Sequence, residues 1–92
     1  MRNLIKTLLL MLMLSLSHAA LADDFKEGVA AYWLMDYSTA YKLWKPLADQ
    51  GSVEAQDSIA WMCDHGQGLE TDHKMAVKWY ALAAEKVMLF PN

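Results

Sequence analysis

The sequence contains one cysteine, two prolines and four glycines in 92 residues. A single cysteine cannot close a disulfide within the chain, so packing alone has to hold the fold together. The low proline and glycine content, together with 55% hydrophobic residues and four tryptophans, excludes a disordered or fibrous chain. The composition therefore indicates a small domain with a packed core.

Positive charge is scarce after the N-terminal segment. Residues 23–92 contain six lysines, no arginine and eleven aspartates or glutamates, which gives a net charge of −5 with histidine neutral. Nucleic-acid backbones and anionic lipid surfaces attract basic proteins, so this balance argues against both as partners. These 70 residues also leave little room for a deep catalytic cleft with its supporting side chains.

Residues 1–22 have the pattern of an export signal. Arg2 and Lys6 form a positive start, an apolar run follows over residues 7–17, and Ala20 and Ala22 supply the small side chains that a signal peptidase accepts. The run is shorter than the roughly twenty apolar residues of a membrane-spanning helix, so we predict cleavage after Ala22 and no stable membrane insertion afterwards. The pattern is typical of a bacterial signal peptide. We expect an exported protein, in the periplasm or, as the alternative, secreted.

The mature chain contains an internal repeat. A shift of 36 residues aligns residues 36–48 with residues 72–84, and apolar residues recur three and four apart in both. This spacing predicts amphipathic helices, each with an aspartate at its start that can cap it. A second apolar stretch precedes each of them, at 25–34 and 55–63, with an offset of 32. Short helix pairs at this period predict an all-α fold, an α/α solenoid of about two antiparallel helix pairs.

The repeated units resemble a known family, the Sel-1-like repeats, which are relatives of the tetratricopeptide repeats. In the second unit the matching residues are Ala55-Gln56, Ile59, Ala60, Gly66, Gly68, Leu69, Asp72, Ala76, Trp79-Tyr80 and Ala83-Ala84. The first unit resembles the family's shorter opening unit through Phe25, Gly28, Ala31-Tyr32, Asp36-Tyr37, Ala40, Trp44, Pro46-Leu47-Ala48 and Gly51. We therefore expect a signal peptide at 1–22, a repeat domain at 23–87 with units at 25–51 and 52–87, and an apolar tail at 88–92.

The resemblance implies a non-catalytic scaffold without a cofactor, which binds another protein through the first helices of its pairs. On the helix at 55–63 the predicted core stripe is Ala55, Ile59, Met62 and Cys63, which leaves other faces for a partner. The candidate partner-binding residues are Glu54, Asp57, Ser58, Trp61 and His65, together with Leu89 and Phe90 of the tail.

Two features of these candidates have more than one interpretation. Trp61 is either an anchor for a partner or a packing residue against a neighbouring helix. The apolar tail is expected to be covered by a partner, by a second copy in a homodimer, or by folding back on the domain.

Two other functional hypotheses remain open at this point. In the first, Cys63, His65 and His73 serve a metal-binding or redox accessory protein, because a thiolate and two imidazoles lie within eleven residues. Their spacing is not that of a paired-ligand motif, and the sequence shows no nucleophile with its base and no phosphate-binding loop. We therefore predict that the protein is not an enzyme. In the second hypothesis, the chain is a truncated remnant of a longer repeat protein.

Export is testable by mass spectrometry. When the full chain is produced in an exporting bacterium, the mature protein is expected to begin at Asp23. Ala22→Arg should block processing because the peptidase accepts only small side chains there, whereas the matched control Leu21→Val should be processed normally. An unprocessed wild-type chain would contradict the predicted signal peptide.

Overall fold

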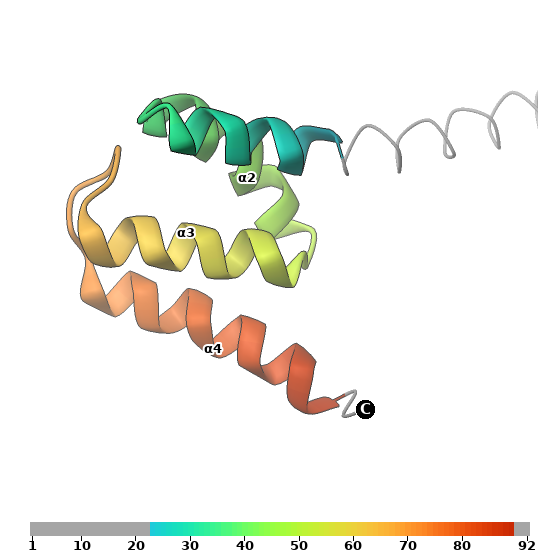
Figure 1. Cartoon of the computed structure of the whole chain (residues 1–92). Coiled ribbons are helices and arrows are strands. Elements are labelled where there is room, and N and C mark those ends of the chain that lie inside the picture. The colour runs from blue at the N-terminus through green and yellow to red at the C-terminus, as the bar shows by residue number, and fades with distance from the viewer. Residues whose placement is uncertain (1–22, 90–92) are drawn as a thin grey trace, which may run out of the picture.

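The computed structural model describes residues 23–89, without the side chain of Leu89, and these residues form helices joined by turns (Figure 1). A helix over residues 23–33 comes first, followed by α2 (Tyr37–Asp49), α3 (Val53–His65) and α4 (His73–Leu89). The predicted signal peptide and Phe90 lie outside the described residues. Within residues 23–89 no strand occurs, and no helix is long and apolar enough to cross a membrane. The predicted all-α fold is confirmed.

The helices form two consecutive pairs. Helix 23–33 packs on α2, α3 packs on α4, and α2 also packs on α3, so that helix 23–33 and α4 lie on opposite sides of α3 (Figure 1). This arrangement confirms the α/α solenoid of about two helix pairs. The last helix is longer than the repeat predicts, because α4 continues through Met88 and Leu89 of the expected tail. No glycine follows Ala84 to end it.

Side-chain caps determine where three helices begin. Asp36 accepts a hydrogen bond from the backbone N–H of Thr39 at 3.3 Å, and Asp72 accepts one from Met75 at 3.0 Å, as the sequence predicts. Ser52 does the same for α3 through the backbone N–H of Ala55, at 3.3 Å. Each cap satisfies a donor that the first turn of the helix leaves unpaired.

The turns that end the helices depend on residues with positive φ. At the end of α3 this residue is Gly66, with φ of 63°, and the following Gln67 donates to the Met62 carbonyl at 3.0 Å. After helix 23–33 the same position is occupied by Met35, also with φ of 63°. A side chain disfavours this conformation, so the packing on either side of the turn has to hold Met35 in place.

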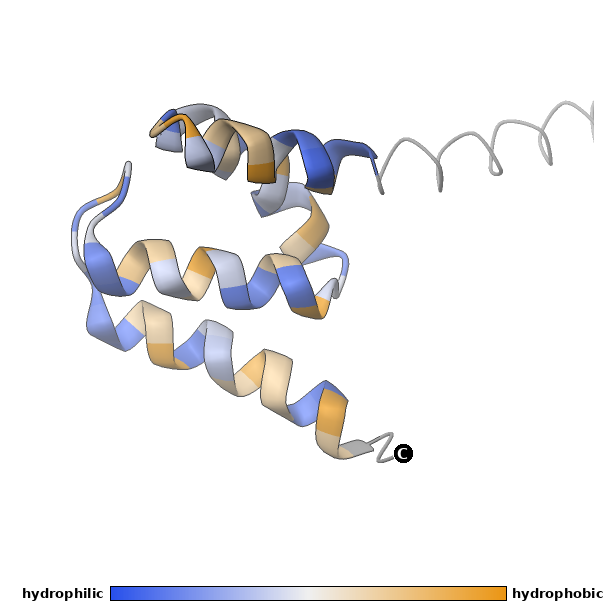
Figure 2. Ribbon diagram, viewed as in Figure 1, coloured by the Kyte–Doolittle hydropathy of each residue, from blue (hydrophilic) through white to orange (hydrophobic). Residues whose placement is uncertain are grey.

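The core lies between the helix pairs. The predicted stripe of α3, namely Ala55, Ile59, Met62 and Cys63, is buried, and so are Ala40, Trp44, Leu47, Ala76 and Ala83 from α2 and α4. Tyr80 differs from its repeat counterpart Trp44, because it is 37% exposed whereas Trp44 is 3% exposed. Apolar residues continue to the C-terminal end of α4 (Figure 2), where Val87 and Met88 are exposed.

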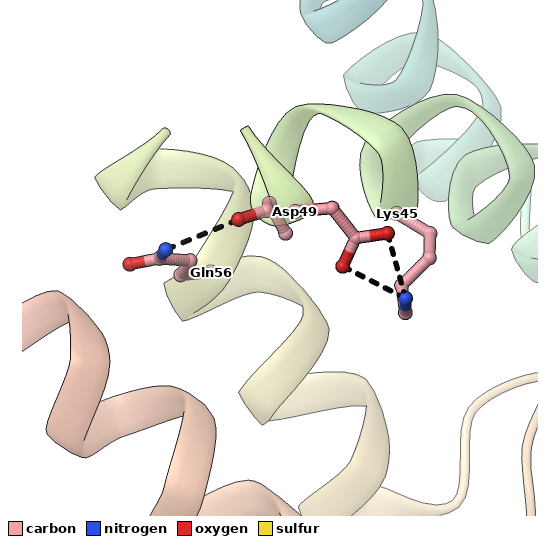
Figure 3. Close-up of polar contacts among 4 residues, drawn as sticks. Lys45, Asp49 and Gln56 are labelled. Atoms are coloured by element: carbon pink, nitrogen blue, oxygen red, sulfur yellow. Dashed lines mark hydrogen bonds and ion pairs between the residues drawn. The ribbon is translucent and has the colours of Figure 1, made fainter. Parts of the chain in front are cut away.

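Polar contacts also join the pairs. The buried Gln56 side chain donates to the Ala48 carbonyl at 3.1 Å and so links α3 to the end of α2 (Figure 3). Lys45 forms an ion pair with Asp49 at 2.9 Å and lies 5.5 Å from the ring centroid of Trp79 on α4. The hydrogen bond to Asp49 is the main cause of the raised pKa of Lys45.

Trp44 joins helix 23–33 to α2. Its indole N–H donates to the Phe25 carbonyl at 3.1 Å, and its ring centroid lies 5.8 Å from those of Phe25 and Tyr32. Gly28 permits this close approach, because a methyl group there would come within 2.7 Å of Trp44 Cδ1. The packing of the first pair therefore requires glycine at this position.

The Gly28 contact can be tested by the sign of a stability change. Helix propensity alone predicts that Gly28→Ala stabilises the protein by up to about 1 kcal/mol. The collision with Trp44 predicts instead a loss of about 1–3 kcal/mol in the free energy of unfolding, measured by urea denaturation of the full chain. The exposed Ala30→Gly is the matched control for propensity in the same helix. A Gly28→Ala variant at least as stable as the wild type would contradict the close packing.

Candidate protein-binding groove

A groove lies between helix 23–33 and α3, the first helices of the two pairs. Its lining consists of Val29, Tyr32 and Trp33 from helix 23–33, Asp57, Ser58 and Trp61 from α3, and Trp44 from α2. Its volume of about 320 Å³ is at the lower end of the range of ligand pockets. The groove can therefore hold one or two side chains of a partner.

The repeat brings the two walls together. The offset of 32 residues matches Val29 with Trp61, so these residues occupy equivalent positions on the first helices of the two pairs. Tyr32 and Trp33 follow Val29 by three and four residues and therefore lie on the same helix face. The Tyr32 hydroxyl donates to Oε1 of Gln67 at 3.0 Å, which ties this wall to the loop after α3.

Trp61 is a surface residue with one neighbour stacked on it. Its side chain is 48% exposed, and the His65 ring stacks on it with centroids 3.9 Å apart. Nδ1 of His65 lies 2.9 Å from the Trp61 carbonyl oxygen and donates to it in the tautomer that has its hydrogen on Nδ1. Trp33, on the other wall, is 77% exposed. Two exposed tryptophans beside one groove are typical of residues that anchor protein interfaces.

The structure brings together three of the predicted partner-binding residues, because Asp57, Ser58 and Trp61 all line the groove. His65 adjoins it through its stacking on Trp61. Glu54 is exposed one turn before Asp57, and its carbonyl accepts a hydrogen bond from the Ser58 hydroxyl at 2.8 Å.

The two predicted tail residues belong to another part of the chain. Leu89 is the last residue of α4, whose C-terminal end lies on the other side of α3 from helix 23–33 (Figure 1). Phe90 lies outside the described residues. Leu89 therefore lies apart from the groove, and any role of the two tail residues remains a prediction.

Sequence reasoning missed the residues of the first pair. Val29, Tyr32, Trp33 and Trp44 line the groove, although none was among the candidates. The offset of 32 that matches Val29 with Trp61 is the available signal, but an apolar residue at Val29 indicates packing as readily as a binding surface. It did not show that the two positions face a common groove.

Charge is unevenly distributed over the helices. Helix 23–33 and α3 together contain six aspartates or glutamates and one lysine, whereas α2 and α4 contain five lysines and two acidic residues. Asp57 is the one carboxylate in the lining of the groove, and it forms no ion pair within residues 23–89. The groove thus lies between the two acidic helices.

The structure does not assemble the predicted metal or redox site. Cys63 is buried, His65 stacks on Trp61, and Nδ1 of His73 lies 2.5 Å from Oδ1 of Asp64. Within residues 23–89 no three histidine, cysteine or acidic side chains are grouped as a metal ion would require. Burial is the main cause of the raised pKa of the Cys63 thiol, and the charge of Asp72 adds to it. A buried thiol with a raised pKa is a poor nucleophile.

Cys63 should react with a thiol reagent only when the protein unfolds. Because its pKa is raised in the folded state, its contribution to stability is present below the ordinary thiol pKa and is lost as the pH rises above it. Labelling over a urea series measures the accessibility of the thiol. The free energy of unfolding at neutral and alkaline pH measures its effect on stability, and Cys63→Ala is the control for other titrating groups. Fast labelling of the native protein would contradict the burial of Cys63.

Comparison with known proteins agrees with this architecture. The family model of the Sel1 repeat matches residues 27–52 and 53–87, while no match was found among curated proteins or among solved structures. Repeats of this family generally mediate protein–protein interactions and are typically non-catalytic. The two matches cover more than half of the chain and confirm the resemblance found in its sequence, so the chain belongs to the Sel1 repeat family.

Proposed function

We propose that this protein is an exported, non-catalytic scaffold that binds another protein through the groove between helix 23–33 and α3. The observation that carries the proposal is the pair of exposed tryptophans, Trp33 and Trp61, on the two walls. Burial of tryptophan contributes much of the binding energy of protein interfaces, and truncation of such an anchor typically costs about 2 kcal/mol or more.

The groove is suited to a partner's side chains because most of its lining is apolar. Asp57 and Ser58 add polar groups on one wall that can orient what binds. The floor and the other wall are held by bonds within the chain, from Trp44 to Phe25 and from Tyr32 to Gln67. A preformed groove loses little conformational freedom when a partner binds.

Export is the part of the proposal that rests on the sequence alone. The segment 1–22 has the charge, apolar run and small residues of a cleaved signal. After cleavage the scaffold would act in the periplasm or outside the cell. Cys63, the one cysteine, is buried, so an oxidising compartment leaves this thiol protected.

A second candidate function is self-association through the C-terminal end of α4. A shallow depression between α3 and α4 is lined mostly by apolar residues, namely Val53, Asp57, Tyr80, Ala83, Ala84, Val87 and Met88. Val87 and Met88 are 60% and 77% exposed, and Leu89 and Phe90 follow them in the sequence. A homodimer that covers this apolar edge would remove it from water.

Site-specific photo-crosslinking in the cells that produce the protein tests the groove. A photoreactive phenylalanine derivative at Trp61 should yield a product with another protein, identified by mass spectrometry. The same group at Lys42, exposed on α2, should not yield it. An added Trp33→Ala substitution should lower the yield at Trp61 at least about fivefold, because a second anchor is lost.

The control for folding is the stability of Trp33→Ala. Because Trp33 is 77% exposed, this substitution should change the free energy of unfolding by no more than about 1 kcal/mol. A crosslinked product of twice the chain's mass would make the partner a second copy and favour self-association. Equal crosslinking from Trp61 and Lys42 would contradict the groove as the binding site.

A further inference from the structure

We infer that the groove binds a cationic side chain of its partner, a lysine or arginine held beside Trp33 and Trp61 with Asp57 as its counter-ion. The inference rests on the proposed function, and it specifies the chemistry of the partner. It follows from the lining of the groove, from the charge of the two helices beside it, and from a similar contact elsewhere in this molecule.

The lining combines aromatic rings with one carboxylate. Trp33, Trp61 and Tyr32 provide aromatic rings, whose faces attract an ammonium or guanidinium group. The His65 ring covers one face of Trp61. Asp57 adds a negative charge that has no ion-pair partner within residues 23–89. An apolar side chain in the groove would remove water from Asp57 without replacing its hydrogen bonds, whereas a cation would satisfy it.

The surrounding charge also favours a cation. The two helices beside the groove contain six acidic residues, and Lys26 is their one lysine, with His65 at the end of α3. Lys26 is exposed, lies one turn before Val29, and forms no ion pair within residues 23–89. The negative field of these helices attracts a basic partner and repels an acidic one. Lys26 opposes this attraction, so its neutralisation should strengthen binding.

A similar contact already exists between α2 and α4 of this molecule. The Lys45 ammonium lies 5.5 Å from the centroid of the Trp79 ring and 2.9 Å from a carboxylate oxygen of Asp49. Tryptophan and aspartate thus hold a lysine together in this fold. In the groove, Trp61 and Asp57 stand one turn apart on α3 and offer the same two kinds of group. The cation there has to come from the partner.

The test uses the full chain after export and three blocked pentapeptides of the form acetyl-Ala-Leu-X-Leu-Ala-amide. X is arginine, citrulline or glutamate, because citrulline keeps the shape of arginine without its charge. Titration followed by NMR should show the arginine peptide binding about tenfold more tightly than the citrulline peptide at low salt. The glutamate peptide should bind most weakly, and the preference should shrink at high salt.

Matched variants assign the preference to the groove. Asp57→Asn should reduce the preference for arginine to less than about threefold. Glu54→Gln removes the same charge three residues earlier on α3, outside the lining, and should leave most of the preference. Lys26→Gln should increase it. Trp61→Leu should weaken both the arginine and the citrulline peptide. Helical circular dichroism verifies that each variant folds.

The outcomes separate this inference from the proposed function. If arginine and citrulline peptides bind equally and Trp61→Leu abolishes both, the groove binds peptides but the cationic preference is wrong. If Asp57→Asn keeps the preference, the assignment of the counter-ion is overturned. Absence of saturable binding of the arginine peptide at millimolar concentration would overturn the inference, while crosslinking from Trp61 decides the proposed function independently.

Discussion

The packing of Trp44 between the first two helices is the contact on which the rest of the structure depends. Its indole N–H donates to the Phe25 carbonyl, and Gly28 lets the ring approach the backbone of helix 23–33. With 3% of its surface exposed, the ring is also the floor of the groove. A single buried side chain thus holds the first pair together and places Trp33 opposite Trp61.

The same repeat position has a different environment in the second unit. Tyr80 is the counterpart of Trp44, and within residues 23–89 no later helix covers it. Its pKa is raised, chiefly by partial burial and then by the charges of Asp64 and Asp57. In the first unit α3 packs on α2, whereas within residues 23–89 no further helix packs on α4 of the second unit. The molecule therefore has an aromatic and acidic groove on one side of α3 and an apolar edge on the other.

Much of this fold could be predicted because helical repeats depend on local patterns. The three- and four-residue spacing of apolar side chains identified the helices, and Asp36 and Asp72 marked two of their starts. All four residues of the predicted α3 stripe are buried, because apolar side chains recur on one face of this helix, but the stripe omitted Gln56 and Ala60, which are buried as well. The length of α4 was missed, since the resemblance predicts that the unit ends at Lys86-Val87, where this family usually has Gln-Gly and this chain has no glycine.

By itself, the sequence determined the helices, their pairing at a fixed period and the candidate residues of one groove wall, because these follow from the order of residues along single helices. Only the tertiary structure decided that Val29, Tyr32 and Trp33 form the other wall. These residues are separated from Trp61 by about thirty positions, and their approach depends on how the Trp44 ring spaces the first pair. It also decided that Cys63, His65 and His73 do not meet at one point, because burial, ring stacking and a contact with Asp64 direct them to different neighbours.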